Sequence, residues 1–500
     1  MNPAFPFSLS ELEDQFEGTC YANSMVEREA RAFWLNRQGD QKTLSVLAPK
    51  GDALLEEFEG QGEDFGNDYV LKSCPTDAGN AKALRAALPW LTARPLGLTT
   101  SAGFGDRLGL ATPGHARALQ GVLRDNASAR IEPIYCQQSI REMTRTRRTP
   151  EEVMTDATWG AFQAGWAGAL GADADHLKNT EDIDNCAAVG FTLFTIDPGD
   201  HVDSEADGDP APTIEKKMEA LPWNHLESSP EDLRRLYVGK TFDLGSQTLT
   251  LDEPSVRRAA AKYGRAVAHV VRMARHLEAC GYTHELEVSV DETESPTTWA
   301  EHAYFASELK RLGVRWVSLA PRYVGRFEKG VDYIGDLDEL RTQLDGHAAI
   351  ARTLGPYKLS IHSGSDKFSV YPLIHAAAQG LVHLKTAGTS YLEALRVIGR
   401  IEPELFRQIG RLARERYETD KKTYHVSADL NQVPVIDQMG PEALPELLDD
   451  FHARQVFHVT FGSALDEFGD RIKAALNADE EAHYAALEQH FRRHLEPFVD

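Results

Sequence analysis

Ionisable residues follow several apolar segments of this chain, at the points where those segments end. Asp200 and His201 come after FTLFTID, and His362 opens HSGSDK after YKLSI. Imidazole nitrogen is a common ligand of transition metals, and a carboxylate often completes the set. We therefore predict His201 and His362 as metal ligands and Asp200 as a general base. The structural alternatives are a buried, hydrogen-bonded histidine and an aspartate that caps a helix or turn.

Three further carboxylates and one histidine are candidates for the same site. Asp291 and Glu292 end the segment ELEVSVDE, and either could supply an acid opposite the general base. Glu287 alternates with Asp291 along the same segment and could face the same side, or it could pair with an arginine in the core. His383 lies inside LVHLKTA and is a further candidate ligand. Capping of the helix that starts near Thr297 is the structural alternative for Asp291 and Glu292.

Cationic side chains in the same segments could bind a carboxylate or a phosphate. Arg107 lies in the glycine-rich stretch SAGFGDRLGLATPGH, whose backbone amides could also bind an anion. Guanidinium and ammonium groups form charge-assisted hydrogen bonds to anions, whereas surface ion pairs are their ordinary alternative. The predicted substrate-binding residues are Arg107, Arg322, Ser365, Asp366, Lys367 and Lys385.

These residues need a scaffold that brings the ends of the apolar segments together. The segments are short and rich in β-branched residues, and longer helical patterns such as 255–280 and 297–313 separate them. This alternation indicates strand–helix–strand units and a parallel sheet. The predicted strands are 95–101, 131–138, 191–197, 285–292, 314–321, 357–363, 381–387, 424–430 and 456–462.

An α/β fold built on a (β/α)8 TIM-like barrel is the first expectation. Nine predicted strands are one too many, so one of them is expected to be a hairpin strand or to lie outside the barrel. In such a barrel the carboxyl ends of the strands converge on one mouth, where active sites lie. A doubly wound open sheet is the alternative, but no GxGxxG follows the first strand to indicate a dinucleotide fold.

The 500 residues divide into three parts by pattern. Residues 1–92 form an N-terminal accessory segment without evident chemistry, which we interpret as a structural cap or an oligomer contact. Residues 93–462 form the catalytic barrel, with an acidic, proline-containing insertion at about 198–255 that is expected to lie over the site. Residues 463–500 form a C-terminal helical segment.

Composition disfavours several classes of protein. A net charge of −24 argues against nucleic-acid binding, which usually demands a basic patch. The five cysteines are widely spaced and form no CxxC pair, which argues against a disulfide framework or a cysteine zinc site. The chain has no apolar stretch of about 18 residues and no basic, apolar leader. We therefore expect a cytoplasmic protein that does not bind a membrane.

The chain resembles the tagaturonate epimerase family in six blocks that occur in order. They are FGDRLGLATPGH, TIDPGDHV, VSVDET, APRYVGRFEKGVDYIGD, KLSIHSGSDKFSVYP and HLKTAGTSYLEALR. The blocks fall within residues 101–396, and the two ends of the chain are less distinctive. The resemblance implies an isomerase that interconverts D-tagaturonate and D-fructuronate in hexuronate catabolism, with a divalent metal ion and a proton acceptor and donor.

The resemblance also implies roles for particular residues. Asp200 would be the proton acceptor and His201 a metal ligand, both in TIDPGDHV. Glu292 of VSVDET would be the proton donor, with Asp291 or Glu287 as alternatives, and His362 would be a second ligand. His383 completes the predicted ligand set, for a cation of the Zn, Mn, Ni or Co type. The expected partner is a small anionic sugar acid, and a homo-oligomer is left open.

The chemistry of these two sugar acids points to carbon–carbon bond cleavage. They differ at C3, counted from the carboxylate, and the ketone is at C5. The C3 hydrogen is not acidified by either group, so enolisation does not invert this carbon, whereas retro-aldol cleavage of the C3–C4 bond does. A base, an acid and a Lewis-acid metal would be required. The alternatives are another metal-dependent sugar enzyme (a ketohexose 4-epimerase, an aldose–ketose isomerase or a class II aldolase) or a non-catalytic sugar-acid binding protein.

Overall fold

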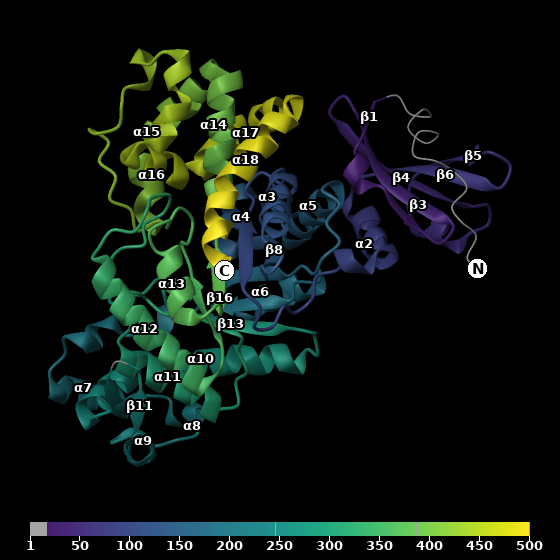
Figure 1. Ribbon diagram of the computed structural model, residues 1–500. Coiled ribbons are helices and arrows are strands. Elements are labelled where there is room, and N and C mark those ends of the chain that lie inside the picture. The colour runs from purple at the N-terminus through teal and green to yellow at the C-terminus, as the bar shows by residue number, and fades with distance from the viewer. Residues whose placement is uncertain (1–17, 246, 387, 500) are drawn as a thin grey trace.

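The computed structural model describes residues 18–245, 247–386 and 388–499. The first 17 residues of the predicted accessory segment and Ala387, at the end of the predicted strand 381–387, lie outside the described residues. The described chain forms an antiparallel N-terminal sheet, a central barrel with its surrounding helices, and a C-terminal group of helices (Figure 1).

A closed barrel of eight parallel strands is the centre of the molecule, which confirms the predicted TIM-like fold. Neighbouring strands follow the order β10-β13-β14-β15-β16-β7-β8-β9. The strands are β7 (Ser101–Gly105), β8 (Glu132–Ser139), β9 (Ala172–Leu177), β10 (Leu193–Ile196), β13 (Glu285–Ser289), β14 (Ser318–Ala320), β15 (Lys358–Ile361) and β16 (Val382–Lys385). Because all of them run in the same direction, their carboxyl ends share one mouth.

Helices cover the outside of the barrel and bury the outward-facing residues of its strands. They are α3 (Thr112–Asp125), α5 (Pro150–Gln163), α6 (Thr180–Ala188), α10 (Glu253–Ala279), α11 (Trp299–Arg311), α12 (Leu337–Leu354), α13 (Tyr371–Ala378) and α14 (Thr389–Ile401), with the short α4 (Ile140–Thr146) between β8 and α5. The apolar residues of α10 that face the barrel, such as Val267 and Val270, are fully buried. This alternation of strand and helix is the one that the sequence pattern predicts.

Strand β9 was not among the predicted strands. In its sequence, ADADHL, the outward positions carry Ala172, Ala174 and Leu177, which belong to the main hydrophobic core. The intervening Asp173 and Asp175 are buried as well, on the other face of the strand. A strand whose inner face is acidic has no apolar run, and the apolar-run criterion therefore missed it.

Two of the predicted strands are wrong. Residues 424–430 are not a strand, and 456–462 lie in α16 (Phe451–Val459) and the first turn of α17 (Phe461–Ala478). The apolar run VFHVTFG is buried in a second hydrophobic core between helices. A short apolar run fits a buried helix as well as a buried strand, so periodicity alone does not separate the two. The first predicted strand is also displaced, because β7 begins at Ser101, where 95–101 ends.

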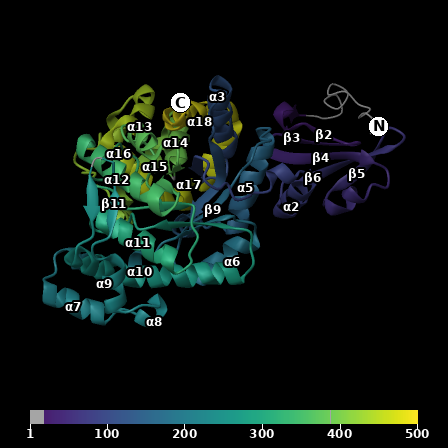
Figure 2. The ribbon, with the colours of Figure 1, turned by 60° about the horizontal axis from the view of Figure 1, so that its bottom comes forward.

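The N-terminal unit projects to one side of the barrel (Figures 1 and 2). Its strands follow the order β1-β3-β4-β6-β5, with β2 beside β3, and a helix packs on the sheet. The elements are β1 (Thr19–Cys20), β2 (Val26–Arg28), β3 (Arg31–Gln38), β4 (Gln41–Pro49), β5 (Gln61–Phe65), β6 (Tyr69–Pro75) and α2 (Ala78–Ala87). Lys42 Nζ lies 2.6 Å from Glu480 Oε1 of α18 (Glu480–Leu495), which ties the sheet to the C-terminal helices.

The insertion at 198–255 does not cover the barrel mouth. It contains α7 (Ala211–Glu219), α8 (Trp223–Leu226), α9 (Pro230–Tyr237) and the hairpin β11 (Thr241–Asp243) and β12 (Thr248–Thr250). These elements lie along the outer surfaces of α10 and α12 (Figure 1). Apolar residues of the insertion such as Ile214 and Leu221 join the main core, so hydrophobic burial against the helix layer fixes its position.

The C-terminal helices begin earlier than the predicted boundary at 463. They are α15 (Pro403–Asp420), α16, α17 and α18, and they share a hydrophobic core with α14. The irregular segment between α15 and α16 reaches the barrel mouth, where residues 423–427 lie against barrel loops. Within the described part of the chain, no helix is both long and apolar enough to cross a membrane.

Candidate metal and acid–base site at the barrel mouth

Two histidines from different strands face each other at the barrel mouth. His176 Nε2 lies 3.4 Å from His362 Nδ1, and the two rings meet edge to face with centroids 5.1 Å apart. His176 comes from the end of β9, and His362 follows directly after β15. Donor atoms that bind one ion at about 2.1 Å are about 3.0–3.4 Å apart, so the pair already has the separation of two metal ligands.

Each of these histidines is held by a carboxylate at its other nitrogen. Glu287 Oε1 lies 2.5 Å from His362 Nε2, and Asp197 Oδ2 lies 3.2 Å from His176 Nδ1. A carboxylate that accepts the outer N–H leaves the inner nitrogen with a lone pair directed at the site. Asp291 Oδ1 is 3.4 Å from His362 Nδ1, and Asp175 belongs with the two histidines to one group of donor atoms within 4.8 Å of one another.

A β-bulge brings Asp175 and His176 to the site together. The register between β9 and β10 shifts between Phe194 and Ile196, and His176 adopts a left-handed backbone conformation with φ of 56°. In a regular strand, neighbouring side chains point to opposite faces, whereas a bulge re-aims one of them. Bulges of this kind occur next to active sites because they let consecutive residues serve one site.

The site strongly favours positive charge. Burial lowers the pKa of His176, but the Asp175 and Glu292 carboxylates outweigh it and raise that pKa to about 10. Burial and Lys385 lower the pKa of His362, but Asp291 and Glu287 outweigh them and raise it to about 9. A cation bound between the two imidazoles would meet the same favourable field as these protons.

Lys385 lies beneath the histidines as a buried, charged anchor. Its Nζ is 2.8 Å from Asp173 and 2.7 Å from Asp175, both on β9, and 2.9 Å from Glu287 on β13. Burial lowers the pKa of Lys385, but these carboxylates more than compensate and hold it well above its usual value. The ammonium group therefore fixes the carboxylates around the two histidines in one arrangement.

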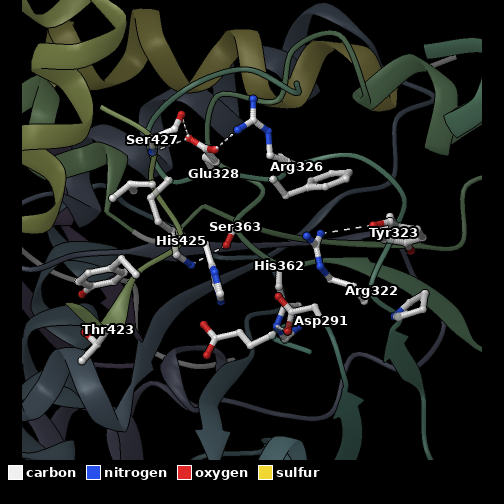
Figure 3. Close-up of a pocket in the computed structure, with 16 residues that line it drawn as sticks. Asp291, Arg322, Tyr323, Arg326, Glu328, His362, Ser363, Thr423, His425 and Ser427 are labelled. Atoms are coloured by element: carbon white, nitrogen blue, oxygen red, sulfur yellow. Dashed lines mark hydrogen bonds and ion pairs between the residues drawn. The ribbon is translucent and has the colours of Figure 1, made fainter. Parts of the chain in front are cut away.

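A cavity of about 330 Å³ opens beside the histidine pair (Figure 3). Its wall is formed by the loops after β13, β14 and β15 and by the segment 423–427, and it ends in a smaller cavity that Asp175 and His176 line. Glu328 Oε2 accepts hydrogen bonds from the Ser427 amide and hydroxyl, which joins that segment to the barrel (Figure 3). The lining residues with charged or hydrogen-bonding side chains include Asp291, Glu292, Arg322, Arg326, Lys329, His362, Ser363 and His425.

Several residues predicted from the sequence lie at this mouth. His362, Arg322, Glu292 and its alternative Asp291 line the larger cavity, and Lys385 and Arg107 line the smaller one. Glu292 pairs with Arg141, whose NH2 is 2.8 Å from Glu292 Oε1. Burial raises the pKa of Glu292, but the charges of His176 and Arg141 lower it to about 2.

Asp200 and His201 lie elsewhere, outside the barrel mouth. The Asp200 carboxylate is exposed and pairs with Lys178 at 2.8 Å. The His201 ring is exposed and stacks on His269 of α10, with centroids 4.2 Å apart. Both residues follow β10 on a short helical turn, and neither is among the described residues that line the two cavities beside His362.

The remaining predicted residues are fixed in internal contacts. The His383 Nδ1 lies 2.8 Å from the Ser101 hydroxyl, in the barrel interior. The Arg107 guanidinium binds Glu142 at 2.6 Å, with its edge toward the smaller cavity. Asp366 pairs with Arg454, and Lys367 donates to backbone carbonyl oxygens that include that of the fully buried Ser365. Ser365, Asp366 and Lys367 are not among the described residues that line the cavities.

Sequence reasoning missed Asp175 and His176, which form a second Asp–His pair in this chain. The available signal was the alternation in ADADHL, where small or apolar residues alternate with ionisable ones at a spacing that places two carboxylates on one face of a strand. It also missed Lys329 and the segment 423–427, because their approach depends on how the barrel closes.

Comparison with known proteins gives consistent matches over almost the whole chain. The sequence model of the tagaturonate epimerase family matches residues 21–498. A tagaturonate/fructuronate epimerase from Thermotoga maritima is 41% identical over 478 residues, which cover 95% of this chain and 96% of the relative. Two crystal structures of a fructuronate-tagaturonate epimerase from Cohnella laeviribosi, one native and one with glycerol, each superpose with a TM-score of 0.89 over 98% of both chains, at 34% and 33% identity.

Proposed function

Because the chain belongs to the tagaturonate epimerase family, we propose that its barrel mouth inverts C3 of D-tagaturonate by metal-dependent retro-aldol chemistry. The chain is an isomerase, a tagaturonate/fructuronate epimerase. Family membership does not by itself identify the mechanism that inverts C3 or the residues that carry it out. The observation that carries the proposal is the pair His176 and His362, whose inner nitrogens converge at 3.4 Å while carboxylates hold their outer nitrogens.

The donor groups at the mouth suit a divalent transition metal. Two imidazoles with an adjacent carboxylate and no thiolate are a typical set for zinc, manganese, nickel or cobalt. His176 and His362 would bind the ion, and Asp291, whose Oδ1 lies 3.4 Å from His362 Nδ1, would add a carboxylate on the His362 side. When bound, such an ion would supply Lewis-acid stabilisation of the negative charge that develops when the C3–C4 bond breaks.

The cavity carries cations that can bind the substrate carboxylate. Arg322 lines its wall, where NH1 makes a 3.3 Å contact with the Tyr323 carbonyl oxygen, so most of its guanidinium is available. Lys329 lies on the same wall with its Nζ 2.5 Å from the Ser363 hydroxyl. An anionic sugar acid held by these groups would place its carbinol carbons toward the histidine pair, because both groups lie on the cavity wall that His362 shares.

Two carboxylates at the mouth are the proposed proton carriers. Asp175 would take the proton of the C3 hydroxyl as the C3–C4 bond breaks, which gives a three-carbon aldehyde acid and the enolate of dihydroxyacetone. The aldehyde then rotates and presents its other face to the enolate. The C3–C4 bond would re-form on that face, and Glu292 would protonate the new C3 oxygen. The balance requires that Glu292 starts protonated and Asp175 starts ionised, so the two carboxylates carry one proton between them.

Arg141 links substrate binding to this proton. In the protein alone, His176 and Arg141 overcome the effect of burial and keep the pKa of Glu292 at about 2, which leaves its carboxylate ionised. A substrate carboxylate that draws Arg141 away would remove part of that stabilisation and let Glu292 bind a proton. Arg141 is partly exposed, with 30% of its side-chain surface accessible, so a substrate in the cavity can reach its guanidinium.

The route of inversion is tested with D-tagaturonate that carries deuterium at C3. Retro-aldol cleavage leaves the C3–H bond intact, so fructuronate should form at nearly the rate of the unlabelled substrate and should retain all of its deuterium. A large primary isotope effect, or loss of deuterium to water, would contradict the proposal, since both require that the C3–H bond breaks. The same assay after metal removal by a chelator should show no product until a divalent metal is restored.

A further inference from the structure

A group of three different metal-binding side chains lies on the outside of the barrel, between α6 and α10. Asp184 Oδ1 is 2.8 Å from His276 Nε2, and Cys280 Sγ is 3.6 Å from each of these two atoms. A carboxylate, an imidazole and a thiol thus converge from α6 and the end of α10, although Asp184 and His276 are 92 positions apart in the chain.

The separations are close to those of ligands around one zinc ion. Tetrahedral zinc with bonds of about 2.3 Å to sulfur and 2.0 Å to nitrogen or oxygen places sulfur about 3.5 Å from either of the other donors, and nitrogen about 3.3 Å from oxygen. Both distances from Cys280 already fit this arrangement. The Asp184–His276 contact would lengthen by about half an ångström, a change that a partly exposed carboxylate makes by rotating.

Helix geometry presents two of these donors on one face. His276 and Cys280 are four residues apart at the end of α10, so their side chains lie one turn apart on the same side. Asp184 belongs to α6, which packs alongside this end of α10. All three side chains are partly exposed, so an ion can enter and a water molecule can take the fourth position.

The other histidine group away from the mouth does not offer free donors. Asp366, His490 and His494 lie close together, but Asp366 is already paired with the Arg454 guanidinium at 2.9 Å. His494 Nε2 accepts the backbone N–H of Asp366 at 3.0 Å, and this hydrogen bond occupies the lone pair that a metal would need. Among the described residues, no lysine or arginine side chain pairs with Asp184 of the Asp184–His276–Cys280 group.

We propose that Asp184, His276 and Cys280 form a second metal site, selective for a thiophilic divalent cation such as zinc and separate from the epimerase site. Cys280 precedes the amino end of β13 by only a few residues, so the group lies toward the end of the barrel opposite the mouth. Its role is structural. The ion joins α6, which follows the strand of His176, to α10, which precedes the strand of Glu287.

In the metal-free group the Cys280 thiol donates a hydrogen bond to the Asp184 carboxylate. Zinc binding displaces that proton, forms the sulfur–metal bond and releases the proton to solvent.

The test uses cobalt(II), which gives a near-ultraviolet sulfur-to-metal charge-transfer band only when a thiolate binds it. Reduced, metal-free protein is titrated with cobalt(II). The cysteine band should appear with one ion per chain and should disappear in Cys280→Ser. Cobalt bound at the mouth does not give this band, because no cysteine is among the described residues that line either cavity. His276→Asn should retain the fold, and the cobalt(II) affinity measured from this band should fall by more than about tenfold.

Cys20→Ser is the matched control, because Cys20 is the other partly exposed cysteine. This variant should keep the band at full intensity. Zinc should also raise the melting temperature of the unmodified protein by more than it raises that of Cys280→Ser, since both retain the mouth. Absence of the band from the unmodified protein, or its persistence in Cys280→Ser with equal zinc stabilisation of both proteins, would overturn the proposal.

Discussion

His176 Nε2 and His362 Nδ1 lie 3.4 Å apart at the barrel mouth, and each ring is fixed from behind by a different carboxylate. Two neutral imidazoles whose lone pairs converge in this way repel each other unless a positive charge lies between them. The surrounding carboxylates raise the pKa of both rings, so this position favours a positive charge. We therefore expect the centre to bind a divalent metal ion and to depend on it.

Mutation of the two Asp–His pairs of the chain should have opposite effects on activity. His176→Ala should lower kcat by at least about a hundredfold and should abolish metal binding at the mouth, since it removes one of two imidazole ligands. His201→Ala should retain normal activity, because the His201 ring is exposed and stacks on His269 outside the mouth. Initial rates with D-tagaturonate and metal content by elemental analysis test both variants. Inactivity of His201→Ala with full activity of His176→Ala would refute the site described here.

Glu287 should act on the metal through His362. Glu287→Gln replaces the charged acceptor 2.5 Å from His362 Nε2 and should weaken metal affinity by about 10–100-fold, as changes behind a metal ligand commonly do. Asp197→Asn, behind His176, should act in the same direction. Activity as a function of free metal concentration gives the measurement, and excess metal should restore most of the rate. Unchanged half-saturation in both variants would show that these carboxylates do not orient metal ligands.

Glu292 should carry a proton and should not be needed for metal binding. Glu292→Gln should lower kcat by about 10²–10⁴-fold, because an amide cannot deliver a proton to the C3 oxygen. Metal content and KM should change little by comparison. Asp291→Asn is the informative comparison, since Asp291 lies 3.4 Å from His362 Nδ1 and its loss should reduce metal affinity. A Glu292 variant with a normal kcat would exclude it as the donor.

Arg322 should select for the carboxylate of the substrate. A charge-assisted hydrogen bond is worth about 1.5–3 kcal/mol, so Arg322→Gln should raise KM for D-tagaturonate by about 10–100-fold. The inhibition constant of the neutral ketose D-tagatose should change much less. Arg326→Gln is the matched control, because Arg326 lines the same cavity but lies 3.3 Å from Glu328. Equal effects on the acid and on the neutral sugar would argue against this role.

Acid should destabilise the fold through the buried pair His302 and His347, which joins α11 to α12 with their Nδ1 atoms 2.9 Å apart. Burial lowers the pKa of His347 to about 3, and burial with His347 beside it holds the pKa of His302 well below its usual value. Both folded pKa values lie below the unfolded value of about 6.5, so the unfolded chain binds more protons below that pH. Stability is therefore complete above about pH 6.5 and is lost as the pH falls toward 3.

Each such histidine contributes up to about 1.4 kcal/mol of lost stability per pH unit in this window. His347→Gln removes one titrating group, so its melting temperature should fall less steeply between pH 6.5 and 4.5 than that of the unmodified protein. Thermal melts at several pH values in that window give the comparison. An equal slope in the two proteins would show that His347 is not titrated on unfolding.

Part of the site followed from the sequence because local pattern and chain order were sufficient. His362, Glu292 and Arg322 each come just after an apolar strand of a strand–helix repeat, and a parallel barrel brings such ends to one mouth. The same pattern failed at 456–462, where an apolar run belongs to packed helices, and at β9, where the inner face is acidic. In both cases the residues facing a segment decided its structure, and these come from distant parts of the chain.

The sequence by itself therefore determined the barrel, the family and the approximate positions where polar residues meet. Only the tertiary structure decided which Asp–His pair belongs to the site. Asp175 and His176 reach it because a bulge in β9 turns consecutive side chains to the mouth and Lys385, from β16, neutralises the carboxylates there. Asp200 and His201 follow the neighbouring strand β10 with a similar local pattern, but both side chains are exposed and neither lines the cavities among the described residues. That difference arises from the register between strands and from buried charge pairs. Both depend on distant parts of the chain, so the spacing of residues within one segment does not predict them.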